Sequence, residues 1–404
     1  MPVAASTLSP ALLAQLQGEE FITSPYPVYR RLREEAPVAW VPWSEDGGQW
    51  WITDYATCAE ALRDSRFSKD IVKRFQPEEA TPIDRSMLFR DPPAHTRLRN
   101  LVNRSFTPRT IERLAPRIEA LVEELLDGMD REGSGDFMAE FAVPLPVTVV
   151  AELLGVPPQD RPAFRRWSAD LIGASDATHQ SEGGYEAALA AEAGIAQYFR
   201  DMMAERRLRP TEDLTSLLLQ VHDEEDRLDE GELLGMLTLL LVAGHETTVN
   251  LLGNGLAALV EHPDAWERLR ATPSLAEGAV EEMLRYDAPV QRATFRWTVA
   301  ATDVAGVAIG EGASVAVVIG SANRDGEAFA DADRFDIGRT PNRHLAFGRG
   351  IHFCLGAPLA RLEGRLAFAA LTRRWAGATV ADGSVRRPNT AFRGYRILPI
   401  HIRR

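Results

Sequence analysis

Apolar residues recur at helical spacing along most of the chain. This periodicity predicts helices over Tyr55–Arg63, Ala94–Asn103, Pro108–Met129, Val147–Leu154, Tyr185–Arg207, Leu275–Tyr286 and Leu359–Trp375. The longest predicted helix runs from about Asp229 to His262, with Asp229 as its N-cap and Pro263 just past its end. Its most apolar run, Leu233–Gly244, is shorter than the roughly 20 residues that a membrane span needs, so we expect a buried core helix.

Short strands are predicted in three places. The residues around Trp40 and Trp51 read as a strand pair joined across Asp46-Gly47-Gly48. Arg292–Gly320 alternates β-branched and small residues between glycines, and Thr390–Ile402 suggests a terminal hairpin. No repeat, low-complexity tract or linker interrupts the sequence, so one mostly α-helical domain over residues 1–404 with a minor sheet is expected.

Composition narrows the class of protein. The chain has 404 residues and a net charge of −13, which disfavours nucleic acid as a partner because an acidic surface repels phosphates. Its two cysteines, Cys58 and Cys354, lie far apart without a CxxC motif, which favours a reducing cytoplasm over a disulfide framework. Residues Met1–Gly18 lack the pattern of a secretory signal or membrane anchor.

The most specific segment surrounds Cys354, within Phe347–Gly356. Glycines allow the backbone to turn and to approach a flat cofactor, and the helix that follows favours a thiolate at its N-terminus. Taken alone, a free cysteine is more often a small buried hydrophobic residue. The glycines and the histidine around Cys354 reverse that preference.

This segment resembles the cytochrome P-450 signature at every fixed position, and those positions are Phe347, Gly348, Gly350, His352, Cys354 and Gly356. The resemblance implies a mainly α-helical P-450 fold, a triangular prism with a minor β-rich region. It also implies that haem lies between the long central helix and the cysteine loop, with Cys354 as the ligand of the iron.

A polar segment, Ala243–Thr248, interrupts the long apolar helix. Glycine and paired threonines weaken a helix interior, so one interpretation is a tolerated polar patch that packs against another helix. The other is an acid–alcohol pair in a loosened turn. The segment resembles the family motif Ala-Gly-x-Glu/Asp-Thr, which implies room for oxygen at Ala243 and Gly244 and proton delivery by Glu246 and Thr247.

Two further pairs of residues gain meaning only from the resemblance. Glu282 and Arg285 lie three apart on one helical face, a spacing that is common by chance. The family implies that they stabilise the fold, with Arg334 as third partner. His95 and Arg99 also share a helical face, and simple surface exposure is the ordinary explanation for such a pair.

The resemblance implies instead that His95 and Arg99 bind the haem propionates. It assigns the same role to His352 and to Arg296, a residue of the predicted strands, and it leaves nearby Arg292 to face the substrate.

The resemblance also implies an activity. The expected enzyme is a monooxygenase that uses haem b (iron protoporphyrin IX) to insert one oxygen atom of O₂ into an apolar small molecule by hydroxylation or epoxidation. Its electrons would come from a ferredoxin or flavodoxin with its reductase, and a monomer is expected. Arginines expected near the donor surface are Arg97, Arg104, Arg109, Arg343, Arg349 and Arg361.

The expected substrate pocket draws on residues 71–89, 171–182, 240–247, 290–295 and 391–392, which are mostly apolar and aromatic. They favour a hydrophobic ligand such as a terpenoid, steroid, fatty acid or polyketide. A peroxide-driven peroxygenase and a non-catalytic haem sensor remain as alternatives, and the Glu246–Thr247 pair argues against both.

Overall fold

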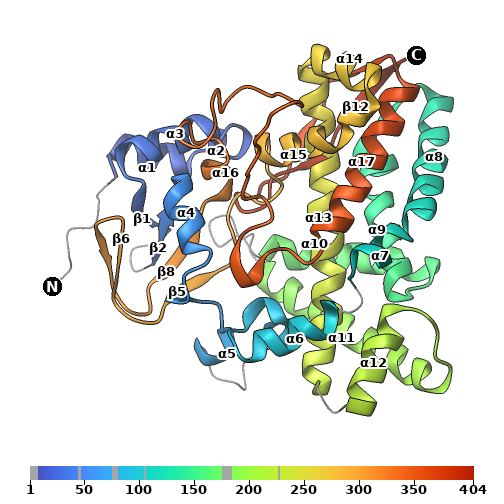
Figure 1. The fold of residues 1–404 in the computed structure, drawn as a ribbon, viewed down its shortest axis with the longest axis horizontal. Coiled ribbons are helices and arrows are strands. Elements are labelled where there is room, and N and C mark those ends of the chain that lie inside the picture. The colour runs from blue at the N-terminus through green and yellow to red at the C-terminus, as the bar shows by residue number, and fades with distance from the viewer. Residues whose placement is uncertain (1–7, 44–46, 75–80, 104–105, 175–183, 226–227) are drawn as a thin grey trace. The chain divides into compact units, whose positions relative to one another are not determined.

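The computed structural model of the protein describes residues 8–43, 47–74, 81–103, 106–174, 184–225 and 228–404. Helices dominate these residues, as predicted (Figure 1). The chain divides into two compact units, each with its own internal contacts. The first unit comprises Met1–Ser68, Val122–Ala142 and Asn250–Arg404, and the second comprises Lys69–Leu121 and Val143–Val249.

The largest sheet belongs to the first unit and has the strand order β1-β2-β8-β5-β3. Its members are β1 (Val38–Pro42), β2 (Gly48–Ile52), β8 (Ser314–Val317), β5 (Arg296–Thr298) and β3 (Phe67–Ser68). Strands β1 and β2 are antiparallel, with Ala39 opposite Trp51 and Trp40 opposite Trp50, so the predicted strand pair is confirmed. Strand β2 pairs with β8 in parallel, which brings residues more than two hundred positions apart into one sheet.

Among the described residues of the first unit there are also three smaller sheets. They are β4 (Ser134–Asp136) with β12 (Pro399–Arg403) and β9 (Gly377–Val380), β6 (Thr302–Val304) with β7 (Val307–Ile309), and β10 (Val385–Arg386) with β11 (Tyr395–Ile397). The predicted terminal hairpin is therefore wrong. Strands β11 and β12 are consecutive, but they pair in different sheets, and alternation along a strand does not specify its partner.

The helices of the first unit are α1 (Pro10–Gln17), α2 (Glu19–Thr23), α3 (Tyr26–Glu35), α4 (Tyr55–Ala61), α14 (Pro263–Ala271), α15 (Ala276–Tyr286), α16 (Ile319–Ala322) and α17 (Ala357–Arg374), with α8 (Ala115–Glu132) from Val122 onward and α13 (Glu230–Glu261) from Asn250 onward. Small residues let the core helices approach closely. A β-carbon at Gly255 would lie 2.5 Å from the Phe368 ring and 2.7 Å from the Met283 sulfur, and one at Gly364 would lie 3.1 Å from Val280.

The second unit contains α5 (Ile71–Arg74), α6 (Ala94–Asn103), α7 (Pro108–Glu112), α9 (Pro144–Leu154), α10 (Arg161–Ala174), α11 (Gly184–Leu208), α12 (Leu214–Glu225) and most of α13 (Glu230–Glu261). Helices α10 and α11 pack through aromatic rings. Phe164 meets Tyr198 edge to face at 4.6 Å between ring centroids, and a β-carbon at Gly194 would lie 2.9 Å from Trp167.

Helix α13 begins as the sequence predicts. The Asp229 carboxylate accepts from the Glu232 backbone N–H at 2.7 Å, and the Glu232 carboxylate accepts from the Asp229 N–H at 3.1 Å, a reciprocal capping box. The helix is long and apolar enough to resemble a membrane span, but 83% of its most hydrophobic window is buried within the structure. This burial agrees with the predicted core helix.

One predicted helix is wrong. Pro108–Met129 was expected to be continuous, but α7 ends at Glu112 and α8 begins at Ala115. Pro116 explains the break, because proline lacks an N–H and is tolerated only in the first turn of a helix.

Candidate functional site

The cysteine loop, Phe347–Gly356, lies in the first unit. Gly348 and Gly350 adopt positive φ angles of 69° and 74°, which only glycine occupies without strain. At Gly350 a β-carbon would also lie 2.9 Å from the Leu62 carbonyl oxygen. Two of the glycines that made the loop recognisable in the sequence are therefore required by its backbone.

Cys354 lies directly before α17, whose N-cap is Gly356. Its backbone N–H donates to the Phe347 carbonyl at 2.9 Å, which closes the loop on itself. The side chain is exposed. An exposed sulfur just ahead of a helix N-terminus is in a position that favours the thiolate.

Cys58 has the opposite surroundings. It is fully buried on α4 and its thiol donates to the Ile52 carbonyl at 3.1 Å. Burial, reinforced by the negative charge of Asp54, raises its pKa well above the usual range of a thiol. The interpretation as a small buried hydrophobic residue therefore applies to Cys58 and not to Cys354.

Two predicted propionate ligands lie in the same unit as Cys354. Arg296 is on β5, where it pairs with Val315, and it is 4% exposed. Its guanidinium donates to the Thr294 carbonyl at 3.2 Å. His352 ends the short 3-10 turn Gly350–His352, two residues before Cys354.

The other two predicted propionate ligands, His95 and Arg99, lie one turn apart on α6 in the second unit. Burial, together with the positive charges of Arg99 and Lys69, lowers the pKa of His95 to about 4. The imidazole is therefore neutral near pH 7. Lys69, only 2% exposed, is a nearby cation that we did not predict, although it is one of just two lysines in the chain.

The polar segment of α13 lies in the second unit and remains helical throughout. The Thr247 hydroxyl donates to the Ala243 carbonyl at 3.2 Å, and the helix shows no loosened turn here. Ala243 is exposed and Thr247 is half-buried, whereas Glu246 is 3% exposed. Ala243 and Thr247 therefore form an accessible stripe on a mostly buried helix.

Gly244 has a packing role. A β-carbon at this position would lie 2.8 Å from Val150 on α9. Close approach of α9 thus accounts for this glycine, as the interpretation of a helix-packing patch foresaw, while the accessible position belongs to Ala243.

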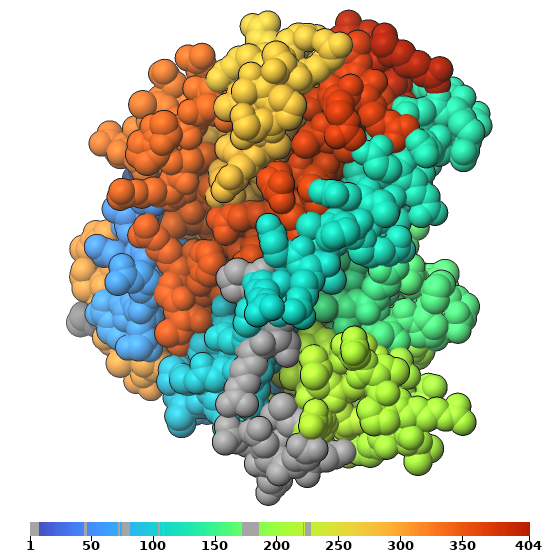
Figure 2. Space-filling model, turned by 45° about the vertical axis from the view of Figure 1, so that its right-hand side comes forward, coloured from blue at the N-terminus to red at the C-terminus, as the bar shows by residue number. Residues whose placement is uncertain are grey.

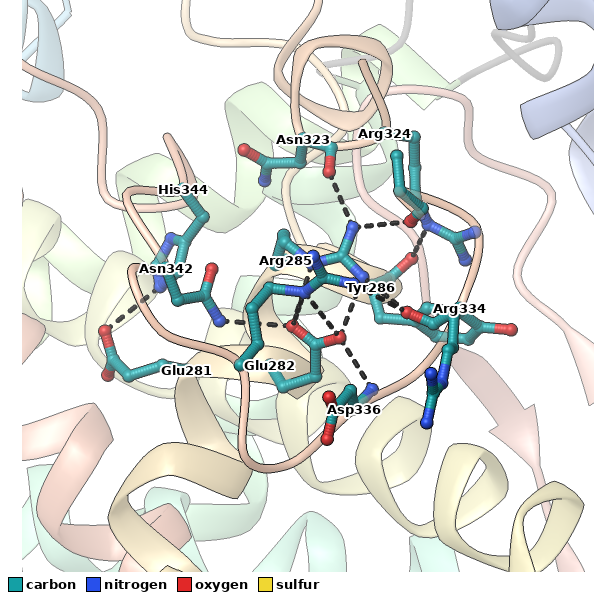
Figure 3. Close-up of polar contacts among 12 residues, drawn as sticks. Glu281, Glu282, Arg285, Tyr286, Asn323, Arg324, Arg334, Asp336, Asn342 and His344 are labelled. Carbon is teal, nitrogen blue, oxygen red and sulfur yellow. Dashed lines mark hydrogen bonds and ion pairs between the residues drawn. The ribbon is translucent and has the colours of Figure 1, made fainter. Parts of the chain in front are cut away.

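Glu282 and Arg285 form a fully buried ion pair on α15 (Figure 3). Two nitrogens of Arg285 each donate to a carboxylate oxygen of Glu282 at 2.8 Å. Arg285 also donates to the carbonyls of Asn323, Ala332 and Arg334, which fixes the turn-rich segment before the cysteine loop. Such extra hydrogen bonds are what a buried pair needs to offset its loss of solvation.

The predicted third partner of this pair is corrected. The cation that contacts Glu282 is Arg339, whose Nε lies 3.2 Å from both carboxylate oxygens. Arg334 has an exposed side chain and contributes only its backbone carbonyl. The Asp336 N–H and the Asn342 side chain complete the shell around Glu282 at 2.8 and 3.1 Å.

Arg292, expected to face the substrate, contacts two residues of its own unit. Its guanidinium lies 5.1 Å from the Trp51 ring centroid and donates to the Thr390 hydroxyl at 2.7 Å. Of the predicted pocket, Phe89 is half-buried and Phe295 is exposed. Residues 75–80 and 175–182, also assigned to the pocket, and Arg104 lie outside the described residues.

Comparisons with known proteins agree with this geometry. The family model of cytochrome P450 matches residues 180–272 and 274–392. The cytochrome P450 monooxygenase PikC of Streptomyces venezuelae is 45% identical over 99% of this chain and 96% of its own length. The polyketide biosynthesis cytochrome P450 PksS of Bacillus subtilis is 40% identical over 97% of this chain and 99% of its own length.

Solved structures show the same likeness. The structure of PksS has a TM-score of 0.88 at 41% identity and covers 96% of this chain and 99% of its own. A myxobacterial cytochrome P450, CYP267B1 in complex with myristic acid, has a TM-score of 0.90 at 38% identity and covers 97% of this chain and 99% of its own.

The chain belongs to the cytochrome P450 family. The predicted family and fold are thus confirmed, and the protein is a P450 monooxygenase, an oxidoreductase.

The P450 family implies a haem cofactor, and the cysteine loop fits one. It presents a single exposed sulfur, with the apolar side chains of Ile351 and Phe353 on either side of His352 exposed by 52% and 40%. An accessible sulfur among exposed apolar side chains suits haem, which is flat and largely apolar and whose iron would take one ligand from the protein.

Proposed function

We propose that this P450 binds haem b and inserts one oxygen atom of O₂ into an apolar small molecule, with Cys354 as the protein ligand of the iron. The observation that carries the proposal is the exposed Cys354 sulfur, held before α17 by a loop whose glycines have positive φ. Haem held by a thiolate supplies the activation of O₂, in which the second oxygen atom is reduced to water.

Residues of both units would bind the haem. In the first unit, Phe347, Gly348 and Gly356 would shape the loop around the sulfur, and His352 and Arg296 would bind propionates. Burial of Arg296 supports its role, since a buried guanidinium favours an anionic partner.

In the second unit, His95 and Arg99 would bind propionates from one face of α6. His95, neutral because its pKa is about 4, would donate a hydrogen bond, and Arg99 would supply charge.

Proton delivery would fall to Glu246 and Thr247 on α13. Glu246 is a carboxylate held at 3% exposure, and Thr247 is a half-buried alcohol that follows it directly. The Thr247 hydroxyl now donates to Ala243, so it must turn away from that carbonyl to pass a proton on. The small, exposed side chain of Ala243 would leave the adjacent space to small molecules, whereas Val150 of α9 occupies the space beside Gly244.

An apolar substrate is supported by the residues expected around the pocket and by the relatives. PksS is named for polyketide biosynthesis, and CYP267B1 was solved with myristic acid. We therefore propose a substrate of the polyketide or fatty-acid kind, hydroxylated or epoxidised at an apolar carbon.

We propose further that residues 1–404 form one haem domain, monomeric and cytoplasmic, without nucleic-acid or membrane partners. A ferredoxin or flavodoxin with its reductase would supply the electrons. Arg343 is exposed and suited to an acidic donor. Arg97 and Arg361 are less suited, because each is paired with a carboxylate, Glu232 and Glu281 respectively.

An optical experiment tests the proposed ligand. The reduced protein with bound carbon monoxide should show the strongly red-shifted Soret band of thiolate ligation, and Cys354→His should lose that band. Cys58→Ala is the matched control, which should keep it because Cys58 is buried on α4. Purified protein without porphyrin, or with the spectrum of a nitrogen ligand, would contradict the proposal.

A further inference from the structure

A second carboxylate of α15, Glu281, binds two side chains from later in the first unit. Arg361 on α17 donates to its two oxygens at 2.7 and 2.9 Å, a bidentate pair. His344 meets the same carboxylate through Nε2 at 3.1 Å, as Figure 3 shows. Burial alone would raise the pKa of Glu281, but the hydrogen bonds from Arg361 and His344 outweigh it and lower the pKa to about 2.

The histidine is held in one tautomer. Its Nδ1 lies 3.2 Å from the Ala346 backbone N–H, which can only donate, so Nδ1 is the acceptor. The proton therefore resides on Nε2 and is donated to Glu281. His344 and Ala346 directly precede the cysteine loop, so this contact fixes where the loop begins.

Arg361 reaches the loop itself. Its guanidinium lies over the Phe347 ring, 4.5 Å from the centroid, and the Phe347 carbonyl is the acceptor for the Cys354 N–H. Hydrogen bonding to Glu281 is the main reason why the pKa of Arg361 is raised, and the negative charge of the Cys354 thiolate adds to the rise. Arg361 is therefore electrostatically coupled to the proposed iron ligand.

We propose that Arg361 and Glu281 act as a charge pair that sets the reduction potential of the thiolate-bound iron. Both are positioning residues, since they act through Cys354 and its loop. The Arg361 cation stabilises an added electron, and the Glu281 anion partly cancels that cation while it holds the guanidinium over Phe347. This inference rests on the proposed function, which supplies the haem that Cys354 would bind.

The two charges predict shifts of opposite sign. Arg361→Gln removes the cation and leaves Glu281 uncompensated, so the midpoint potential of the holoenzyme should fall. Glu281→Gln leaves the cation uncompensated, so the potential should rise. Each shift should correspond to a change on the order of fivefold in the ratio of reduced to oxidised enzyme at a fixed potential. The double variant should return toward the wild-type value.

Arg373 and Glu123 provide matched controls. They form an ion pair of the same type, with Arg373 on the same helix twelve residues beyond Arg361. At about 1.5 Å per residue, that places it roughly 18 Å further along α17. Arg373→Gln and Glu123→Gln should leave the potential near the wild-type value, since solvent screens exposed charges at that distance.

Arg361→Lys keeps the positive charge but loses the bidentate geometry of the guanidinium, so it separates the two effects. It also provides a second test if Arg361→Gln does not fold. It keeps the cation, so its potential should stay closer to wild type than that of Arg361→Gln. Shifts of the same sign in Arg361→Gln and Glu281→Gln, or shifts no larger than those of the controls, would overturn the inference. The proposed function fails separately, if the wild-type protein lacks the thiolate spectrum.

Discussion

Cys58 and Cys354 carry the same thiol in surroundings that favour opposite protonation states. Burial keeps Cys58 neutral, while exposure before a helix favours the thiolate at Cys354. The sequence could distinguish them because the loop before Cys354 needs glycine at two positive-φ positions, Gly348 and Gly350, and these glycines are part of the motif that the sequence shows. It could not reveal Lys69 beside His95, since a lone lysine has no periodic or motif signal.

Thr247 gives a prediction on coupling. Thr247→Ala removes the hydroxyl proposed to pass protons, so less product should form per reducing equivalent and more peroxide should be released. Thr248→Ala is the matched control, because it removes the adjacent alcohol, which is 2% exposed and outside the motif position. Product and peroxide are measured against reductant consumed. Equal coupling in the wild type and Thr247→Ala would contradict the proposed proton delivery.

Glu363 on α17 gives a prediction on pH. It is 1% exposed, and neither carboxylate oxygen has a hydrogen-bond partner among the described residues. Burial raises its pKa from 4.5 to about 8, so the folded protein holds a proton that the unfolded chain releases. The folded-state pKa is the higher one, so the contribution of Glu363 to stability should be greatest below about pH 4.5 and should decline as pH rises to about 8.

Glu363→Met removes the carboxyl at similar volume and should raise the melting temperature, most of all at pH 8. Between pH 5 and 8 the melting temperature of the variant should depend less on pH than that of the wild type. Glu123→Gln, a change at a carboxylate that is 43% exposed, should leave the wild-type profile in place. Parallel profiles for Glu363→Met and the wild type would show that Glu363 is not buried in its neutral form.

At the scale of elements, sequence patterns predicted helices better than their breaks. Ala94–Asn103 was predicted with the bounds that α6 has, because its apolar positions keep one helical period. Several helices were missed, among them α1, α3, α10, α12 and α14. Much of what decides them is tertiary, such as the packing of Phe164 against Tyr198, and no local pattern carries that information.

The residues around Glu282 likewise show that local sequence patterns predict contacts within one helix but not contacts with a distant segment. The spacing of Glu282 and Arg285 specifies their pairing, because residues three apart on a helix meet. Whether Arg334 or Arg339 supplies the second cation beside Glu282 depends on how the irregular segment that carries both arginines packs against α15. In the structure Arg339 points inward, where it also donates to the carbonyls of Ala330 and Asp331.

The capping box of α13 gives a prediction at this scale. Asp229→Ala removes the acceptor for the Glu232 N–H and should lower the free energy of unfolding by about 1 kcal/mol. Asp229→Asn keeps an acceptor oxygen and should retain most of the stability. Denaturant titration of the holoenzyme measures both variants. An equal loss in the two would mean that charge, and not the cap, is what Asp229 contributes.

At the scale of the whole chain, contacts within the first unit join segments that are far apart in the sequence. Ion pairs between α17 and α8 join residues about 250 positions apart, with Arg374 donating to Glu123, and Figure 2 shows these helices against one another at the surface. A second set of such contacts is buried around Asp287. Asp287 accepts from Tyr26 at 2.6 Å and from Arg386 and Arg393, so residues near both ends of the chain meet one carboxylate.

Asp287 gives the prediction at this scale. Burial would raise its pKa, but Arg393, Arg386 and Tyr26 outweigh burial and lower the pKa to about 2. The folded-state pKa is thus the lower one, so the stabilisation is present above about pH 3.8 and is lost as pH falls toward 2. Asp287→Asn should lower the free energy of unfolding by about 3 kcal/mol at pH 7, because it leaves the buried guanidinium of Arg393 and the partly buried one of Arg386 without their anion.

Tyr26→Phe should cost only about 1 kcal/mol, since it removes the hydrogen bond to Asp287 and a long one from Gln291 at 3.4 Å and leaves the ion pairs in place. Arg30→Gln provides the control. It breaks an ion pair with Asp333 that joins equally distant segments, but both side chains are at least half exposed. Water competes for such a pair, so stability should hardly change. If Arg30→Gln destabilised the protein as much as Asp287→Asn, the separation of the joined segments along the chain, and not the burial of charge, would explain what Asp287 contributes.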